Sequence, residues 1–421
     1  MAMDFESTLD KYAELIVKVG INLQKGQKLV MNGKSFTRGV PLDAAPLVRR
    51  IAEHAYKAGA PFVDILWDDA QVSLTRLNHS TNATIEEYPA WRTEGIHRTV
   101  SEGGALFTLY AEDPDLFKDA DPDLVSKAQR TMERNLAPVM DLLSLNAFNW
   151  SLTSVPVAGW AKKVFPEKDT QQAIDDLWQM IFTLCRLDRD DPVKAWEEHI
   201  AGLASRSDYL NNKAYDALHY RGPGTDLTIG MPKGHIWRSA RVTSTKGIAY
   251  VANLPTEEVF SMPDKNRAEG TVKAALPLSY SGRLIEDFSV TFKGGRAVKV
   301  EAKKGQDTLQ NLIESDEGAA RLGEVALVPQ SSPIAQTGIL FYNTLFDENA
   351  ASHIALGRAY QETIQGGEEM SPEEFEAAGG NKSIVHVDFM IGSKEMDIDG
   401  LTADGKAEPI MRQGEWAFDV E

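Results

Sequence analysis

The first half of the chain alternates between segments with helical periodicity and short apolar runs, and this alternation constrains the fold more than any other feature. Helices are predicted over residues 9–19, 46–57, 88–100 and 124–143, and strands over 28–31, 62–67, 105–110 and 150–155. Repeated alternation of this kind is typical of a parallel sheet covered by helices. We therefore expect an α/β fold for this half of the chain.

The second half has a different pattern, because short alternating segments replace the long helices after Arg221-Gly-Pro-Gly224. Strands are predicted over 227–229, 248–254, 271–278, 284–292 and 297–302. Tight-turn residues such as Lys293-Gly-Gly295 separate them, which is typical of antiparallel hairpins. We therefore predict an α/β N-terminal domain with a mainly parallel sheet over residues 1–215. An α+β C-terminal domain rich in antiparallel strands is predicted over 216–421.

The charge of the chain excludes several classes of partner. Its 421 residues include 44 Lys and Arg against 62 Asp and Glu, a formal charge of −18. Such a surface repels nucleic-acid phosphates and anionic lipid, so we expect no nucleic acid and no membrane as partners. The sequence contains neither a long apolar span nor a basic, apolar secretory signal. With a single cysteine, Cys185, a disulfide framework is excluded and the cytoplasm is the expected location.

Motifs of nucleotide and serine chemistry are missing from the sequence. Gly33-Lys34-Ser35 resembles the end of a phosphate-binding loop, but the position five residues earlier is Lys28 rather than glycine. Neither a G-x-S-x-G nucleophile elbow nor an H-E-x-x-H zinc motif occurs. These absences weaken the nucleotide-dependent and serine-hydrolase hypotheses.

One predicted strand near the C-terminus, residues 384–391, carries a histidine and an acid two positions apart. Successive side chains of a strand point to opposite faces, so His386 and Asp388 project to the same side. An imidazole and a carboxylate held in this way are suitable metal ligands. A hydrogen-bonded pair on a solvated strand face is the alternative interpretation.

A second cluster extends from Asp347 to Tyr360 and combines acids, a histidine and a tyrosine with small residues. If residues 353–360 are helical, the separation of seven places His353 and Tyr360 on one face. A capped surface helix is the alternative.

Two carboxylate sites flank apolar strands in the same half. In the pair Glu257-Glu258, strand alternation lets only one carboxylate face inward, and Glu324 begins an apolar run. A carboxylate on a buried strand is costly unless it is paired or bound to metal. Taken together, these sites supply a ligand set suited to two divalent ions such as zinc or cobalt.

Four segments in fixed order now point to a known family. They are Thr256-Glu-Glu-Val-Phe260, Gly323-Glu-Val325, Asp347-Glu-Asn-Ala-Ala-Ser-His-Ile-Ala-Leu-Gly357 and His386-Val-Asp-Phe-Met-Ile-Gly392. In these segments and over its whole length the chain resembles the thermophilic metallo-aminopeptidases of the aminopeptidase T, aminopeptidase S and aminopeptidase II type. The resemblance implies a homodimer with two divalent metal ions per chain (zinc or cobalt, or magnesium) that releases N-terminal amino acids from peptides with a free N-terminus.

The resemblance also implies roles for individual residues. The metal ligands would be Glu258, Glu324, Glu348, His353, His386 and Asp388. Glu324 would bridge the ions or serve as the catalytic carboxylate, taking a proton from the attacking water, and Tyr360 would donate a hydrogen bond to the oxyanion. The N-terminal domain would restrict access and support the dimer.

Two alternatives to the aminopeptidase remain at this point. The first is another two-metal hydrolase, an amidase or a phosphoesterase, built on similar ligands. The second is a non-enzymatic protein that binds a small ligand in its α/β domain and carries the acids on its surface. Substrates with a blocked α-amine separate the first alternative from the aminopeptidase, and metal analysis separates the second.

Overall fold

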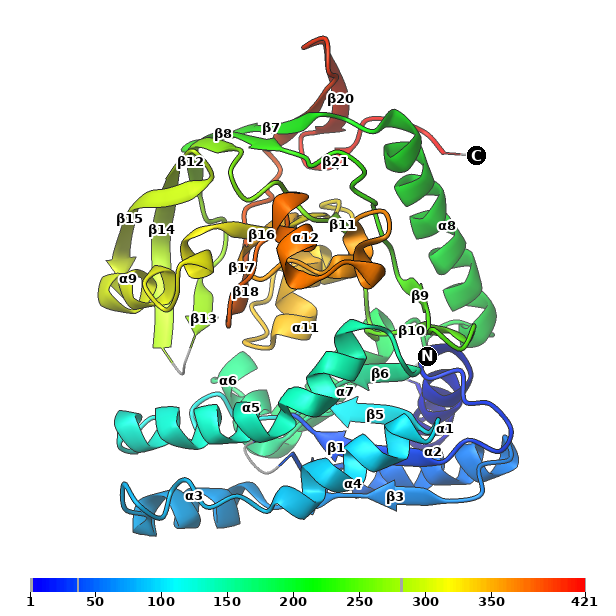
Figure 1. Ribbon diagram of the computed structural model, residues 1–421. Helices are drawn as coiled ribbons and strands as arrows, with labels where there is room; N and C mark the ends of the chain where they lie inside the picture. Colours follow the sequence, from blue (N-terminus) through cyan, green and yellow to red (C-terminus); the bar gives the residue numbers. More distant parts are fainter. Residues whose placement is uncertain (1–2, 36–37, 281–282, 421) are drawn as a thin grey trace. The chain divides into compact units, whose positions relative to one another are not determined.

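The computed structural model describes residues 3–35, 38–280 and 283–420 (Figure 1). The chain forms two compact units that are interleaved in sequence. Unit 1 comprises Met1–His199 and Arg241–Pro255, and unit 2 comprises Ile200–Ala240 and Thr256–Glu421. Within the described part of the chain, helices that combine the length and the apolarity needed to cross a membrane do not occur.

Unit 1 is built on a four-stranded parallel sheet in the order β3-β1-β5-β6. Its strands are β1 (Leu29–Gly33), β3 (Val63–Ile65), β5 (Ala105–Leu109) and β6 (Trp150–Thr153). The short strands β2 (Val40–Pro41) and β4 (Trp67–Asp68) pair beside it, and β9 (Arg241–Thr243) pairs with β10 (Ala249–Val251). Every residue of β1 and β5 is buried, as expected for central strands covered on both faces.

The helices of unit 1 carry apolar faces that cover this sheet. They are α1 (Phe5–Leu15), α2 (Ala45–Lys57), α3 (Ala70–His79), α4 (Ala90–Ser101), α5 (Pro122–Ser144), α6 (Ala158–Val164) and α7 (Thr170–Leu184). In α2, for example, the buried residues Leu47, Ile51 and Ala55 recur every four positions. Helix α8 (Pro192–Lys213) begins in unit 1 and ends in unit 2.

Unit 2 contains two antiparallel sheets. The larger, of nine strands among the described residues, runs β13-β14-β12-β8-β7-β19-β20-β21, with β15 paired to β14. Its strands are β7 (Ala217–Gly222), β8 (Thr225–Gly230), β12 (Ala268–Lys273), β13 (Leu278–Tyr280), β14 (Arg283–Lys293), β15 (Arg296–Lys304), β19 (Asp397–Leu401), β20 (Ala407–Arg412) and β21 (Glu415–Trp416).

The smaller sheet has the order β11-β16-β17-β18 and is antiparallel throughout. It comprises β11 (Val259–Ser261), β16 (Leu322–Leu327), β17 (His353–Gly357) and β18 (His386–Met390). Short helices connect these strands: α9 (Gln306–Ile313), α10 (Pro333–Thr337), α11 (Thr344–Asp347) and α12 (Pro372–Ala377). Phe389 of β18 contacts Phe288 of β14 at 5.4 Å between ring centroids, so one face of the smaller sheet packs on the larger one.

The parallel sheet in the first half and the antiparallel sheets in the second confirm the predicted fold class. The face shared by His353 and Tyr360 was argued only for a helical segment, and that condition is not met. Residues 353–360 are not helical, because His353–Gly357 form β17 between β16 and β18. All five residues of β17 are buried, and pairing with β16 and β18 satisfies their backbone groups, whereas a short helix leaves its first four N–H and last four C=O groups without intrahelical partners.

Candidate metal centre

The smaller sheet of unit 2 brings four of the predicted ligands to one face. In the strand register, Glu324 of β16 lies opposite Ala355 of β17, which lies opposite Asp388 of β18. His353 and His386 are each two positions from a member of this row, so strand alternation places them on the same face. This face is the one opposite Phe389 and the core.

A bulge in β16 decides which face Glu324 occupies. Leu322 pairs with Leu356 and Glu324 pairs with the adjacent Ala355, so Gly323 is an extra residue in β16. Strict alternation would place Leu322 and Glu324 on one face, whereas the bulge sends Leu322 to the core and Glu324 to the site. A Cβ on Gly323 would lie 2.3 Å from the carbonyl oxygens of Gly357 and Arg358, so only glycine fits there.

Both tandem acids before β11 are buried. Glu258 contacts His353 at the site. The backbone N–H of Glu257 donates to the side-chain oxygen of Asn349 at 2.7 Å, and Asn349 is itself fully buried. This bond fixes the segment that presents Glu258 to the sheet. The role of Asn349 could not be inferred from the sequence, because a single buried asparagine has no distinctive spacing.

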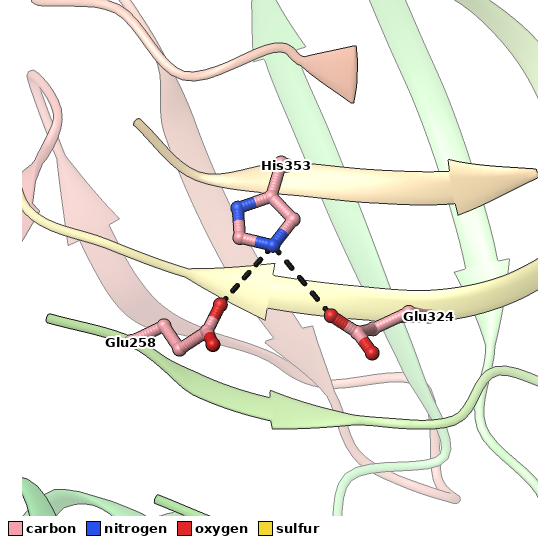
Figure 2. A group of neighbouring side chains, drawn as sticks. All are labelled: Glu258, Glu324 and His353. Carbon is pink, nitrogen blue, oxygen red and sulfur yellow. Dashed lines mark ion pairs between the residues drawn. The ribbon is translucent and has the colours of Figure 1, made fainter. Parts of the chain in front are cut away.

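The carboxylate of Glu324 lies between two histidines. Its Oε1 atom is 3.5 Å from His353 Nε2, and its Oε2 atom is 3.7 Å from His386 Nε2. On the outer sides, His353 Nε2 lies 3.1 Å from Glu258 Oε2, and His386 Nε2 lies 3.4 Å from Asp388 Oδ1. Figure 2 shows the first half of this arrangement, with Glu258 and Glu324 both directed at His353. Two three-ligand groups therefore share one carboxylate, and in each group the ligand atoms lie within 4.8 Å of one another.

The second nitrogen of each imidazole is already engaged by the backbone. His353 Nδ1 lies 3.1 Å from the carbonyl oxygen of Ala351, and His386 Nδ1 lies 2.6 Å from that of Arg358. Since a carbonyl oxygen only accepts, each Nδ1 carries the proton and donates it. In a neutral ring the lone pair is then on Nε2, the atom that faces the carboxylates. This tautomer is the one that metal-binding histidines adopt.

The buried charges of the centre alter its protonation equilibria. Burial opposes the charged form of His386, but Asp388 and Glu324 outweigh it and raise the pKa of the imidazole to about 9. Glu258 and Glu324 likewise outweigh burial and raise the pKa of His353. Burial raises the pKa of Glu324, and the charges of Asp388 and Glu258 add to this effect. In the absence of another cation, protons thus compensate the carboxylates.

The two remaining predicted residues lie at the margin of the centre. Glu348 belongs to neither three-ligand group, but burial and the charges of Glu258 and Asp388 raise its pKa, so it shares their field. The ring of Tyr360 lies 4.8 Å from that of His386 between centroids, and burial followed by the charge of Glu324 raises its pKa. Both residues were predicted, although Tyr360 reaches the site from the loop after β17 rather than from a helix.

The geometry of these side chains fits a divalent metal ion better than a set of hydrogen-bonded histidine–carboxylate pairs. Glu258 Oε2 and Asp388 Oδ1 are buried without a hydrogen-bond partner, even though each lies within 3.5 Å of an imidazole nitrogen. The imidazole N–H groups are therefore not directed at these oxygens, while the donor atoms of each group lie within 4.8 Å of one another. Carboxylate and imidazole donors of this kind are ligands for zinc and cobalt.

Comparison with known proteins gives a consistent result. A model of the thermophilic metalloprotease family M29 matches residues 5–416. Aminopeptidase 2 of Geobacillus stearothermophilus is 46% identical over 99% of both chains, and aminopeptidase AmpS of Bacillus subtilis is 45% identical over 98% of this chain and 99% of its own. The structure of wild-type AmpT from Thermus thermophilus has a TM-score of 0.92 and 42% identity, and the match covers 99% of this chain and 100% of that one.

The family model thus spans nearly the whole chain, and the relatives match it from end to end. The resemblance first drawn from four short segments is confirmed over the full length. The chain therefore belongs to the M29 family of thermophilic metalloproteases.

Proposed function

We propose that the protein is a metal-dependent aminopeptidase that removes N-terminal residues from peptides at a two-metal centre. The relatives named aminopeptidase support the reaction. The position of Glu324 supports two ions, because its two oxygens face different histidines and so join two ligand groups. Zinc or cobalt is the expected metal, with magnesium less suited to the two imidazoles.

The residues divide into two ligand sets in this proposal. One ion is held by Glu258, His353 and Glu324, and the other by Glu324, His386 and Asp388. When bound, the ions supply Lewis-acid polarisation of the scissile carbonyl and a water of lowered pKa. The bulge at Gly323 and the backbone bonds to both Nδ1 atoms hold the donors in place before any ion arrives.

The proton transfers then fall to residues outside the ligand set. Both oxygens of Glu324 face histidines, which favours the bridging role over the proton transfer, the two roles that the family resemblance implied for it. Glu348 stands outside both groups. Burial and the charges of Glu258 and Asp388 raise its pKa, and cations bound beside it would offset those charges and leave an ionised carboxylate that can accept a proton. We therefore assign to Glu348 the transfer of a proton from the attacking water to the leaving amine. The Tyr360 phenol, kept protonated by burial, donates a hydrogen bond to the oxyanion.

A panel of aminoacyl-nitroanilides, measured with and without a chelator and after metal addition, tests this function. We expect hydrolysis that the chelator abolishes and that zinc or cobalt restores, and no hydrolysis of the N-acetylated analogues. Equal hydrolysis of free and N-acetylated substrates would indicate an amidase, and turnover of phosphoesters alone would indicate a phosphoesterase. A stoichiometrically metal-free protein with no hydrolysis would leave only a binding role.

Separate measurements address the remaining proposals. Static light scattering of the purified chain, which measures its molar mass in solution, tests the homodimer. Fractionation of the source cells tests the cytoplasmic location. The proposal that the N-terminal part restricts access predicts that turnover falls as peptides lengthen. A flat length dependence would contradict it.

A further inference from the structure

The order of the strands in the sheet of unit 1 reverses at one point. In chain order its strands are β1, β3, β5 and β6, and in space they run β3-β1-β5-β6. The chain therefore first moves to one side of β1 and then crosses to the other, which makes the gap between β1 and β5 a topological switch point. In open parallel sheets, ligands bind outside the carboxyl ends of the strands at this point.

Two basic side chains lie at that edge. The backbone N–H of Lys34, which follows β1, donates to the carbonyl of Leu109, the last residue of β5, at 3.0 Å. Its ammonium nitrogen lies 4.0 Å above the ring of Tyr110. Arg38 returns to the same strand end, since its carbonyl oxygen accepts from the N–H of Gly33 at 3.3 Å. The residues at this edge thus come from the two strands that border the switch point.

Two donor groups at the edge are buried and lack partners among the described residues. They are the Nε–H of Arg38 and the hydroxyl of Tyr88. The charges of Arg38 and Tyr88 act on each other's pKa, so the two groups lie within electrostatic range of each other. Glu112 and Glu133 are the acids whose charges act most on Arg38, yet the described residues include no ion pair that joins either one to it. Burial raises the pKa of Glu112 to about 7 although Lys34 and Arg38 lower it, so this acid offsets the two cations only in part. A guanidinium and an ammonium only donate hydrogen bonds, and a phenol donates readily, so this set can take a further acceptor with negative charge.

We propose that the switch point of unit 1 binds the carboxylate group of a peptide or amino acid through Arg38, Lys34 and Tyr88. The planar guanidinium of arginine matches a carboxylate in a bidentate manner, with the ammonium and phenol as further donors. A phosphate would suit the same donors. The choice of a carboxylate rests on the proposed peptidase function, whose substrates and products carry this group. The site is separate from the metal centre of unit 2 in every residue.

Titration calorimetry on the metal-loaded, full-length protein tests this inference. The probes are an N-acetylated dipeptide with a free carboxylate, the same peptide as its C-terminal amide, and inorganic phosphate. The acetyl group removes the α-amine that an aminopeptidase centre requires, so the experiment reports on the new site. We expect the acid to bind and the amide to bind at least about tenfold more weakly, as for loss of a hydrogen bond to a charged group.

Variants assign the binding to these residues. Arg38→Met should reduce binding of the acid to the level of the amide. Lys34→Met and Tyr88→Phe, which remove a surface charge and a single hydroxyl, should each weaken it and keep the test valid if the Arg38 variant fails to fold. Lys57→Met is the matched control. Lys57 is an exposed lysine at the end of α2, which precedes β3, so it lies toward the amino end of that strand and not at the carboxyl ends that form the switch point.

Three results would overturn the proposal. They are equal binding of acid and amide, unchanged binding of the acid in the Lys34 and Tyr88 variants, and tighter binding of phosphate than of the acid. The nitroanilide assay keeps this inference distinct from the proposed function. If that function is wrong, hydrolysis is absent while the acid still binds, and if this inference is wrong, hydrolysis continues while the acid does not bind.

Discussion

The substitution Gly323→Ala separates the geometry of the metal centre from its chemistry, because it leaves every ligand in the sequence. A Cβ at this position would lie 2.3 Å from two carbonyl oxygens, whereas real Cβ contacts essentially never fall below 3.0 Å, so the backbone must shift by at least about 0.7 Å. One of the two oxygens, that of Arg358, also accepts the Nδ1–H of His386. The shift therefore displaces Glu324 directly and disturbs the orientation of His386.

The expected cost to function exceeds the cost to stability. Crowding of a well-packed site costs roughly 1–3 kcal/mol of unfolding free energy. A displacement approaching 1 Å in the reacting groups can lower turnover about 100-fold. We expect a folded Gly323→Ala protein with reduced metal content by elemental analysis and about 100-fold lower turnover of an aminoacyl-nitroanilide. Gly95→Ala is the control, because Gly95 lies in α4 with no atom within 4 Å of an added Cβ. Wild-type metal content and turnover in Gly323→Ala would refute the role of the bulge.

Four further predictions concern individual groups. Glu258→Gln should lower metal content and turnover severely, whereas Glu257→Gln should be milder; the reverse ranking in elemental analysis would show that the wrong acid was assigned. Glu348→Gln should keep both metals and lose turnover, and loss of metal instead would make Glu348 a ligand. Tyr360→Phe should keep metal content and KM but lower kcat about 10²–10³-fold, and wild-type kcat would remove Tyr360 from the mechanism. In chelated protein, the pKa of His386 is raised to about 9. Its stabilising contribution is therefore complete below about pH 6.5 and is lost as the pH rises to about 9. Melting temperatures that do not fall over this range would contradict the assignment.

The sequence allowed the residues of the centre to be predicted, but not the backbone that arranges them. His386 and Asp388 were placed correctly because a two-residue spacing on a strand has one geometric consequence. The segment 353–360 could be treated only conditionally as a helix, because Ile354, Ala355 and Leu356 are compatible with a helix or a strand, and pairing with two distant strands decides between them. Short apolar runs of this kind do not reveal their partners.

The position of Glu324 illustrates the same limit more sharply. Simple alternation along β16 would assign it to the core face together with Leu322, and a single extra residue reverses that assignment. Nothing in Gly323-Glu-Val325 identifies the glycine as a bulge, since glycine occurs in strands for several reasons. In unit 1, each strand of the parallel sheet was predicted near its observed position. The spatial order of these strands was not predicted, because no local signal in the sequence specifies it.

The interleaving of the two units has a consequence for how the protein is made. Residues 241–255 belong to unit 1, where the N–H of Leu152 donates to the carbonyl of Ala252, but the ribosome synthesises them only after residues 200–240 of unit 2. Unit 1 therefore cannot complete its structure while it is the only part of the chain outside the ribosome, and it must wait with one edge of its sheet unpaired. No single cut of the gene yields either unit intact. A fragment with the native fold of unit 1 would need residues 1–199 joined by a short linker directly to 241–255.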